Sequence, residues 1–518
     1  RLKLVKISKT KGEKCGMENK YALAMYDIRG KQEFIYRSSR IKEIIGGSAL
    51  IRDCFEGLYK LDKKKQEKIG EGIFHNKEIA FSERTFKEHL QEGYIGEVVY
   101  DGGGNFQLIF KDDETCKDVT YEFSKELMKK VPSLRVLCTY IVGVNFSDYL
   151  GDRKKLYDLH RVREMQESNV RPYAAFPIVQ LDRRTSMPLT GKNSVGEKVS
   201  AESKAKYDKY DEIRKNKPDE ETILDNLVTQ RDEESLLAVI YIDGNSMGAK
   251  VQKCCDGKKS YEDCVAALRQ FSAQIQKNYI EDRLDEIDNF FIKKYKTAQD
   301  GGKLKRRFVV YAGDEITFIC NARDAYDIMR LYLQNLPKGE SSCAGAVIFQ
   351  SHSPYSEAYR IAEECCENAK KVMKERKLTD TSLMDFHYSQ GGTGESLETI
   401  RDKELGGIIS KPWIVKVSED EEKKTENLIR IETVERVRKF LNQLGRSNVK
   451  GLAEHARYSA SDLEMELMRI KAHMSESKRK QTDFNCWESS DKNEMRKLIY
   501  DMVIMYDLWF YDVEGEQE

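Results

Sequence analysis

The sequence contains a weak internal repeat, and this repeat limits the folds that the chain can adopt. The first copy begins with an apolar strand, Tyr21–Tyr26, in "YALAMYDIRG", and continues further along with "GEVVYDGGGNFQLIF". The second copy begins with "LLAVIYIDGNSMG" at Leu236–Gly248 and continues with "RRFVVYAGDEITFIC" at Arg306–Cys320. Each of the two later segments reads as strand, tight turn and strand. A charged helix-like stretch and another apolar strand follow, near residues 134–144 and 341–349.

The order strand, helix, hairpin, helix, strand is that of a ferredoxin-like domain of the βαββαβ type. A Gly-containing turn between two apolar runs is a specific hairpin signal. After about residue 427, apolar residues recur at spacings of three and four, which predicts a helical bundle. We therefore expect an α+β protein with two ferredoxin-like domains and a C-terminal α-helical bundle. The expected boundaries are 1–20 for a disordered extension, 21–150 for the first domain, 151–235 for a charged helical connector, 236–390 for the second domain, 391–426 for a second connector and 427–518 for the bundle.

The composition narrows the possible functions. Lys+Arg and Asp+Glu both number 88 in 518 residues, so the formal net charge is zero, whereas a stand-alone nucleic-acid binder usually has a basic excess. No apolar run approaches the roughly 18 residues of a membrane span, and no leader-like segment opens the chain, so we expect a cytoplasmic protein without a membrane partner. The twelve cysteines include no Cys-x-x-Cys, which leaves a structural zinc site unsupported.

Three acidic residues of the second copy form the candidate catalytic site. Asp243 ends the first strand, and Asp314 and Glu315 lie in the hairpin turn of "YAGDE". If the strand lies beside the hairpin, the three carboxylates converge, and such a cluster repels itself unless cations neutralise it. Oxygen ligands of this kind suit Mg²⁺ or Mn²⁺, and two such ions can activate an attacking hydroxyl and stabilise a leaving pyrophosphate.

The residues around these acids are suited to binding phosphate. Ala312 and Gly313 leave room for a phosphate to approach the turn backbone. The loop between strand and helix offers backbone N–H groups, which makes nucleotide-binding candidates of Gly244, Asn245, Ser246, Met247 and Gly248. Asp-Gly after a strand and Gly-Asp in a hairpin are also ordinary turn chemistry, and for either motif alone we favour that alternative. The joint placement of the two motifs favours a site.

The first copy serves as an internal comparison. It has Asp27 after its first strand, but Gly104 and Asn105 stand where the second copy has its two hairpin acids. One carboxylate cannot hold two metal ions, so we expect the first copy to be non-catalytic, with a Gly-rich turn that could still hold a nucleotide.

Several of these motifs together resemble the large subunit of type III CRISPR effector complexes. "YDIRGKQEFIYRSSRIKEIIGGSALI" and "YDGGGNFQLIF" resemble the first palm domain of that family, and "PIVQLDRRTSMPLTGK" resembles the stretch before its second palm. "VIYIDGNSMG" and "VVYAGDEITF" resemble the second palm, whose hairpin normally reads Gly-Gly-Asp-Asp. "SPYSEAYRIAEECCENAKKVMKERK" resembles the family helix whose Ala-Lys follows a later strand of that palm. GGDEF diguanylate cyclases are a more distant resemblance. The similar segments span roughly residues 21–390.

The resemblance implies two palm domains, of which the second is catalytic, in a synthase that joins ATP molecules. A 3′-hydroxyl would attack an α-phosphate and release pyrophosphate. By matching position, Asp243, Asp314 and Glu315 would bind Mg²⁺ or Mn²⁺ together with the backbone carbonyl of Ile242, and Lys370 would neutralise the donor triphosphate. The residues that would lie near the acceptor nucleotide are Gly46, Gly47, Ser48, Gly103 and Gly104.

The sequence also departs from that family's pattern. It contains no His-Asp dipeptide and leaves no room for an HD nuclease domain before residue 21, so DNA cleavage is not expected. Glu315 replaces an aspartate and Ala312 replaces a glycine of the family hairpin. The metal spacing, the base and the ring size can therefore differ from those of cyclic oligoadenylate synthesis.

Three functions remain open at this stage. The first is an enzyme that makes a cyclic mononucleotide or oligonucleotide signal in antiviral defence. The second is a scaffold subunit of an RNA-guided assembly, with other effector subunits as partners and RNA as the activator. The third is a GGDEF-like cyclase that uses GTP. The three acids of the second copy favour an enzyme, because a pure scaffold has no reason to concentrate acids at one point.

Overall fold

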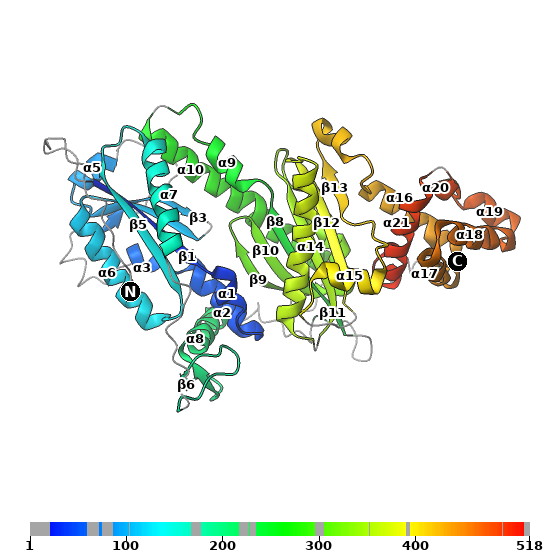
Figure 1. Cartoon of the computed structure of the whole chain (residues 1–518), viewed down its shortest axis with the longest axis horizontal. Coiled ribbons are helices and arrows are strands. Elements are labelled where there is room, and N and C mark those ends of the chain that lie inside the picture. The colour runs from blue at the N-terminus through cyan, green and yellow to red at the C-terminus, as the bar shows by residue number, and fades with distance from the viewer. Residues whose placement is uncertain are drawn as a thin grey trace. The chain divides into compact units, whose positions relative to one another are not determined.

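The computed structural model describes residues 21–59, 72–74, 86–102, 104–166, 178–216, 227, 235–258, 260–295, 305–351, 353–389, 394–488 and 490–511. The chain divides into two compact units (Figure 1). The first unit comprises 1–218, 246–280 and 312–314, and the second comprises 219–245, 281–311 and 315–518. Among the helices of the described residues, none has the length and apolar character needed to cross a membrane.

The first unit is built on a five-stranded sheet. In spatial order its strands are β2 (Ile73–Phe74), β3 (Gly96–Gly102), β4 (Asn105–Phe110), β1 (Tyr21–Arg29) and β5 (Arg135–Val144). β1 pairs antiparallel with β4 and with β5, and β3 pairs antiparallel with β4. The short edge strand β2 is parallel to β3. The apolar strand that opens the first repeat therefore lies inside the sheet, with a neighbour on each side.

Helices cover both faces of this sheet, because β1 is apolar on both of its sides. Ala22, Ala24 and Tyr26 are buried in one core, and Leu23 and Met25 are buried in another, as the alternation of side chains along a strand requires. The helices are α1 (Lys31–Tyr36), α2 (Ile41–Arg52), α3 (Glu56–Tyr59), α5 (Phe86–Gln91), α6 (Asp113–Lys130), α7 (Tyr149–Gln166) and α8 (Ala201–Asn216), and a small hairpin of β6 (Leu189–Lys192) and β7 (Lys198–Ser200) precedes α8. The core of Ala22 includes side chains of α3 and α6, and the core of Leu23 includes side chains of α7.

Residues 246–280 belong to the first unit, although they follow the first strand of the second sheet. They form α9 (Met247–Lys253), α10 (Tyr261–Ile275) and the start of η3 (Gln276–Glu281). Tyr261, Val265 and Leu268 on one side of α10 are buried in the core that contains Leu23. The sequence places this segment in the domain 236–390, because helical spacing reveals an apolar face but not which sheet the face will cover.

The second unit is built on a six-stranded sheet. In spatial order its strands are β13 (Trp413–Val417), β12 (Thr381–Tyr388), β11 (Ser342–Gln350), β8 (Leu236–Gly244), β10 (Glu315–Asn321) and β9 (Arg306–Ala312). β8 pairs antiparallel with β10 and β11, and β12 is parallel to β11. The accompanying helices are α11 (Asp282–Tyr295), α13 (Ala325–Gln334), α14 (Tyr355–Glu375) and α15 (Leu397–Leu405).

The long helix α14 packs directly on β11, β12 and β8 (Figure 1). Gly345 of β11 makes this close packing possible. A Cβ atom at Gly345 would lie 2.1 Å from the carbonyl oxygen of Ala362 and 2.4 Å from the backbone nitrogen of Cys366, both in α14. The absence of a side chain at Gly345 therefore fixes how deeply α14 sits on the sheet.

The chain ends in a helical region, as the sequence predicts. It consists of α16 (Ile431–Leu444), α17 (Arg446–Tyr458), α18 (Ala460–His473), α19 (Glu476–Gln481), α20 (Asn485–Glu488), α21 (Lys492–Ile504) and η6 (Tyr506–Phe510). The last segment packs on the second sheet, where the ring of Trp509 lies 4.6 Å from that of Phe386 and the indole N–H of Trp509 donates to the carbonyl of Ala322. Aromatic contacts thus tie the helical region to the sheet.

The predicted α+β class is confirmed, but both sheets are larger than the four strands of a simple βαββαβ domain. β2 is added to the first sheet, and β12 and β13 are added to the second. β13 lies within residues 391–426, which the sequence pattern predicts to be a connector. These extra strands are not shared by the two repeat copies, so a comparison of the copies gave no signal for them.

Candidate functional site

Asp243 and Glu315 occupy opposite positions on neighbouring strands. Asp243 is the last residue but one of β8, Glu315 is the first residue of β10, and the two are antiparallel partners. Residues placed in this way have Cβ atoms about 4.5–5.5 Å apart. Gly313 and Asp314 form the turn before Glu315, and Gly313 has a φ of 66°, which suits a two-residue hairpin. The strand end therefore lies beside the hairpin, as the hypothesis requires.

Lys370 reaches this pair from α14. Its Nζ donates to the carboxylate of Asp243 and, at 3.1 Å, to the carbonyl oxygen of Gly244. Burial alone would lower the pKa of Lys370, but the carboxylate of Asp243 outweighs burial and raises it. The side chain is therefore held as a cation at the acidic strand end.

The charge of Glu315 acts on two buried tyrosines. Burial is the main cause that raises the pKa of Tyr241, and the charges of Glu315 and Asp243 raise it further. Burial and the charge of Glu315 raise the pKa of Tyr355 in the same way. Negative charge is thus concentrated between the sheet and α14, in surroundings where charges are poorly screened, and an added cation is favoured there.

The loop after β8 is fastened to the sheet at Asn245. Its backbone N–H donates to the carbonyl of Ser341 at 3.0 Å, and its side-chain amide donates to the Ser341 hydroxyl and to the carbonyl of Thr381. The protein already uses the N–H groups of Asn245 in these bonds, and the part of Asn245 in binding a nucleotide stays a prediction. Ser246, Met247 and Gly248 belong to the first unit, and their part in phosphate binding stays a prediction.

The donor groups of the second sheet fit a hard divalent cation. Asp243, Asp314 and Glu315 offer only carboxylate oxygens, which are ligands that Mg²⁺ and Mn²⁺ take. Ile242 lies inside the sheet, opposite Ile316, with its side chain buried, so only its backbone carbonyl could contribute. Because Lys370 contacts Asp243, a bound cation would share this carboxylate with the lysine.

The first sheet repeats the register with different chemistry. Asp27 of β1 is the cross-strand partner of Asn105, as Asp243 is the partner of Glu315. The sequence alignment of the two copies is therefore confirmed at this position. Asn105 carries a neutral amide where the second copy has a carboxylate, and the expectation that this copy is not catalytic stays a prediction.

Lys370 also has a counterpart in the first copy, which sequence reasoning missed. The strand residues opposite the two acids on β5 and β11 are Leu137 and Cys343. Glu164 on α7 follows Leu137 by 27 residues, and Lys370 on α14 follows Cys343 by 27 residues. A glutamate therefore stands where the second copy has its lysine. The signal was present in the sequence, but it required the strand register to count from.

Asp27, His160 and Glu164 form the one group among the described residues in which three such side chains have ligand atoms within 4.8 Å of one another. Arg29 bonds to both acids, at 3.1 Å from Asp27, and so supplies the positive charge that a metal would supply. Burial would raise the pKa of Asp27, but hydrogen bonds from His160 and Arg29 hold it below its usual value. His160 is also oriented by Thr139, whose hydroxyl lies 3.0 Å from its Nδ1. We read this cluster as an ion-pair network.

Asp243, Asp314 and Glu315 do not form a group this compact within the described part of the chain. The direct pairing of Asp243 with Glu315 brings two of the three acids to neighbouring positions, and the part of Asp314 stays a prediction. Like charges move apart unless a cation lies between them, and Lys370 draws Asp243 toward α14.

Gly46 and Gly47, predicted near an acceptor nucleotide, are buried in α2, which packs on α8. A Cβ atom at Gly46 would lie 1.9 Å from the carbonyl oxygen of Lys206, and one at Gly47 would lie 3.2 Å from the Cε of Lys206. The packing of the two helices accounts for both glycines. Ser48, on the same helix, is half-buried.

Gly46→Ala is expected to destabilise the first unit by about 1–3 kcal/mol, because α2 must move away from α8. Gly451→Ala is the matched control, since Gly451 lies in α17 with no atom near its missing Cβ. That substitution is expected to stabilise the chain by about 0.5–1 kcal/mol. Urea unfolding followed by circular dichroism measures both, and equal effects of the two substitutions would contradict the packing role of Gly46.

The first hairpin carries a lysine at its turn. Gly104 has a φ of 75°, and a Cβ atom there would lie 2.3 Å from the Nζ of Lys31. The first copy thus places a cation beside the turn where the second copy has acids. Gly103 lies outside the described residues, and the role of either glycine in binding a nucleotide stays a prediction.

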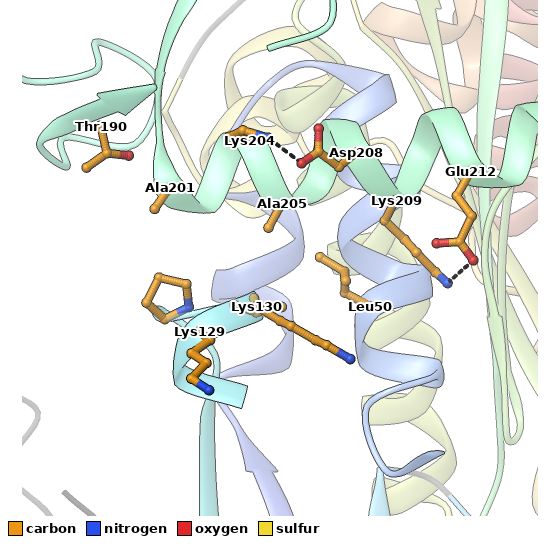
Figure 2. A pocket seen from close by; sticks show the side chains of 12 residues that line it. Leu50, Lys129, Lys130, Thr190, Ala201, Lys204, Ala205, Asp208, Lys209 and Glu212 are labelled. Carbon is orange, nitrogen blue, oxygen red and sulfur yellow. Dashed lines mark hydrogen bonds and ion pairs between the residues drawn. The ribbon is translucent and has the colours of Figure 1, made fainter. Parts of the chain in front are cut away.

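A pocket of about 480 Å³ lies elsewhere in the first unit, between the end of α6, α2 and α8 (Figure 2). Lys204 pairs with Asp208 and Lys209 pairs with Glu212 along its α8 side. Lys129 and Lys130 of α6 also line the pocket, so its lining carries more positive than negative side chains. It contains none of the residues predicted from the sequence.

Comparisons with known proteins found similarity only among solved structures. No protein-family model and no curated protein matches the chain. The apo Csm1-Csm4 cassette is 14% identical over 94% of this chain and 70% of that chain, with a TM-score of 0.46. A Csm1-Csm4 cassette in complex with cA4 is 12% identical over 94% of this chain and 70% of that chain, with a TM-score of 0.45. Csm1 in T. onnurineus is 13% identical over 94% and 69%, with a TM-score of 0.44.

A further match, the Csm1-Csm4 cassette in complex with one ATP, covers 72% of this chain but only 56% of the length of that chain. This chain therefore matches only part of each of these longer chains.

Proposed function

We propose that the chain is a metal-dependent nucleotidyltransferase whose site is built from Asp243, Asp314 and Glu315. The observation that carries this proposal is the direct pairing of Asp243 with Glu315 at the edge of a Gly-Asp hairpin, with Lys370 above them. The first sheet repeats this geometry without the second carboxylate and without the lysine. A difference of this kind at matched positions indicates a role that only the second copy performs.

The side chains of the site have distinct roles in this proposal. Asp243, Asp314, Glu315 and the carbonyl of Ile242 hold Mg²⁺ or Mn²⁺, which supplies charge to activate a ribose hydroxyl and to stabilise pyrophosphate. Lys370 binds the triphosphate of the donor nucleotide and keeps it aligned for attack. The new bond joins the hydroxyl oxygen to the α-phosphorus, and the bond from the α-phosphorus to the pyrophosphate oxygen breaks.

The family resemblance guides the finer assignment. We propose that each sheet is an enlarged ferredoxin-like palm, that ATP is the substrate and that the product is a cyclic oligonucleotide signal in antiviral defence. Effector subunits of a type III-like assembly are the proposed partners, with RNA as the activator. The strand orders β5-β1-β4-β3 and β11-β8-β10-β9 within the two sheets support the palm assignment.

The test is to incubate the purified chain with Mg²⁺ or Mn²⁺ and each nucleoside triphosphate in turn, to measure pyrophosphate, and to identify the product by mass spectrometry. A cyclic adenylate product supports the proposal, and a cyclic guanylate would move the assignment to a GGDEF-like cyclase. If neither metal gives pyrophosphate, with or without partner subunits and RNA, the chain is a scaffold subunit and the proposal is wrong.

Lys370→Met is expected to lower kcat/KM for the nucleotide by about 10- to 100-fold, because a hydrogen bond to a charged group is lost. Lys374→Met is the matched control, since Lys374 is an exposed lysine one turn further along α14. Steady-state pyrophosphate release measures both variants. An equal decrease of kcat/KM in the two variants would show that the position of Lys370 is not special and that any lysine of α14 has the same effect through its charge.

A further inference from the structure

Two adjacent cysteines lie at the end of α9 in the first unit. Cys254 is the C-cap residue of α9, and Cys255 follows it. Their Sγ atoms are 3.8 Å apart, and both are free thiols. Cys255 is buried in the core with Cys264, whereas Cys254 is half-buried. Cys254 is therefore the more accessible thiol of the pair, and Cys255 is the buried one.

The two thiols differ in acidity. The hydrogen bond from Cys255 lowers the pKa of Cys254, and the positive charge of Arg153 lowers it further against the effect of burial. The pKa of Cys255 is raised by its hydrogen bond to Cys254 and by burial. A thiolate is the nucleophilic form of cysteine, so Cys254 is the more reactive of the two.

The second Cys-Cys pair of the chain lacks this arrangement. Cys365 and Cys366 of α14 are both buried, and their side chains have different partners. Cys366 donates to the carbonyl of Cys343, and Arg401 donates to the sulfur of Cys365. Adjacency in sequence alone therefore does not bring two sulfur atoms together, and the turn after α9 does.

We propose that Cys254 and Cys255 form a peroxide-reactive dithiol that closes to a vicinal disulfide. The sulfur of Cys254 attacks one oxygen of a hydroperoxide, the O–O bond breaks, and a sulfenic acid and water (or an alcohol) are formed. The sulfur of Cys255 then attacks the sulfenic sulfur, the S–S bond forms, and a second water leaves. Two thiols and one hydrogen peroxide thus give one disulfide and two waters. The sulfur atoms need to approach from 3.8 Å to about 2.05 Å.

The test treats the full, reduced chain with a small excess of hydrogen peroxide and blocks the remaining thiols with iodoacetamide after denaturation. Mass spectrometry is expected to find an internal disulfide between Cys254 and Cys255 that dithiothreitol reverses. Cys54 is the matched control, because it is also half-buried but burial raises its pKa to about 12. Cys254 is expected to react at least about 10-fold faster than Cys54.

Single variants separate the two steps. Cys255→Ser is expected to stop at the sulfenic acid of Cys254, which dimedone labels, and Cys254→Ser is expected to leave Cys255 unlabelled. A circular dichroism spectrum like that of the unchanged chain confirms that each variant is folded. Oxidation of Cys54 as fast as Cys254, or a disulfide that joins Cys254 to another chain, would overturn the proposal.

Discussion

Asp243→Asn is expected to lower pyrophosphate release at least about 100-fold. Substitution of a residue that only hydrogen-bonds to a metal ligand already weakens metal binding about 10- to 100-fold, and Asp243 is a proposed ligand itself. The substitution keeps the size and the hydrogen-bonding shape of the side chain but removes its charge. Both partners of Asp243 are then affected, since Lys370 loses its counter-ion and a cation loses a ligand that it would share with Glu315.

Asp27→Asn is the control for this prediction. Asp27 has the same position in the register of the first sheet, so the substitution makes the same chemical change in a related setting. It is expected to weaken the ion pair with Arg29 while leaving pyrophosphate release within about threefold of that of the unchanged chain. A larger loss from Asp27→Asn than from Asp243→Asn would place the chemistry in the first sheet and contradict the assignment.

Asp385→Ala is expected to lower the free energy of unfolding of the second unit by about 3–5 kcal/mol, because it leaves a buried guanidinium without its partner. Asp385 lies in β12 and accepts hydrogen bonds from both terminal nitrogens of Arg401, at 2.6 and 3.0 Å. It also accepts from Asn368 of α14 at 2.7 Å. The carboxylate of Asp385 thus links the sheet to α14 and α15, and its partner Asn368 on α14 is two residues before Lys370.

The pH dependence of this effect has a definite sign. Burial would raise the pKa of Asp385, but Arg401 and Asn368 hold it below its ordinary value of 3.8. The stabilisation is therefore complete above that value and is lost as the pH falls through the lower pKa of the folded state. Urea unfolding at pH 7 and near pH 3 is expected to show a smaller difference between the two proteins at the acidic pH.

Two further variants check the cause. Glu476→Ala removes an exposed ion pair with Lys480 and is expected to change stability by less than about 1 kcal/mol. The double variant Asp385→Leu with Arg401→Met removes both buried charges, so it is expected to be more stable than Asp385→Ala. If the double variant is less stable than the single variant, the loss comes from packing and not from an unpaired charge.

The repeated strand-and-hairpin units could be predicted from the sequence alone, whereas the pairing of Asp243 with Glu315 was a condition of the hypothesis that the strand register met. The alternation of apolar residues in a strand and the Gly of a tight turn are patterns of a few neighbouring residues, so they can be recognised in the sequence alone. The alignment of Asp27 with Asp243 and of Asn105 with Glu315 could be made from the sequence for the same reason. The α+β class and the helical end of the chain followed from the same local patterns.

The groups that surround those acids could not be predicted without the tertiary structure. Burial and long-range pairing joined Lys370 to Asp243, enclosed Asn245 within the protein and assigned α10 to the first unit. The strand register also shows that Glu164 stands in the first copy where the second copy has Lys370. These outcomes depend on how apolar faces and charges far apart in the chain meet, and local spacing carries no information about such meetings.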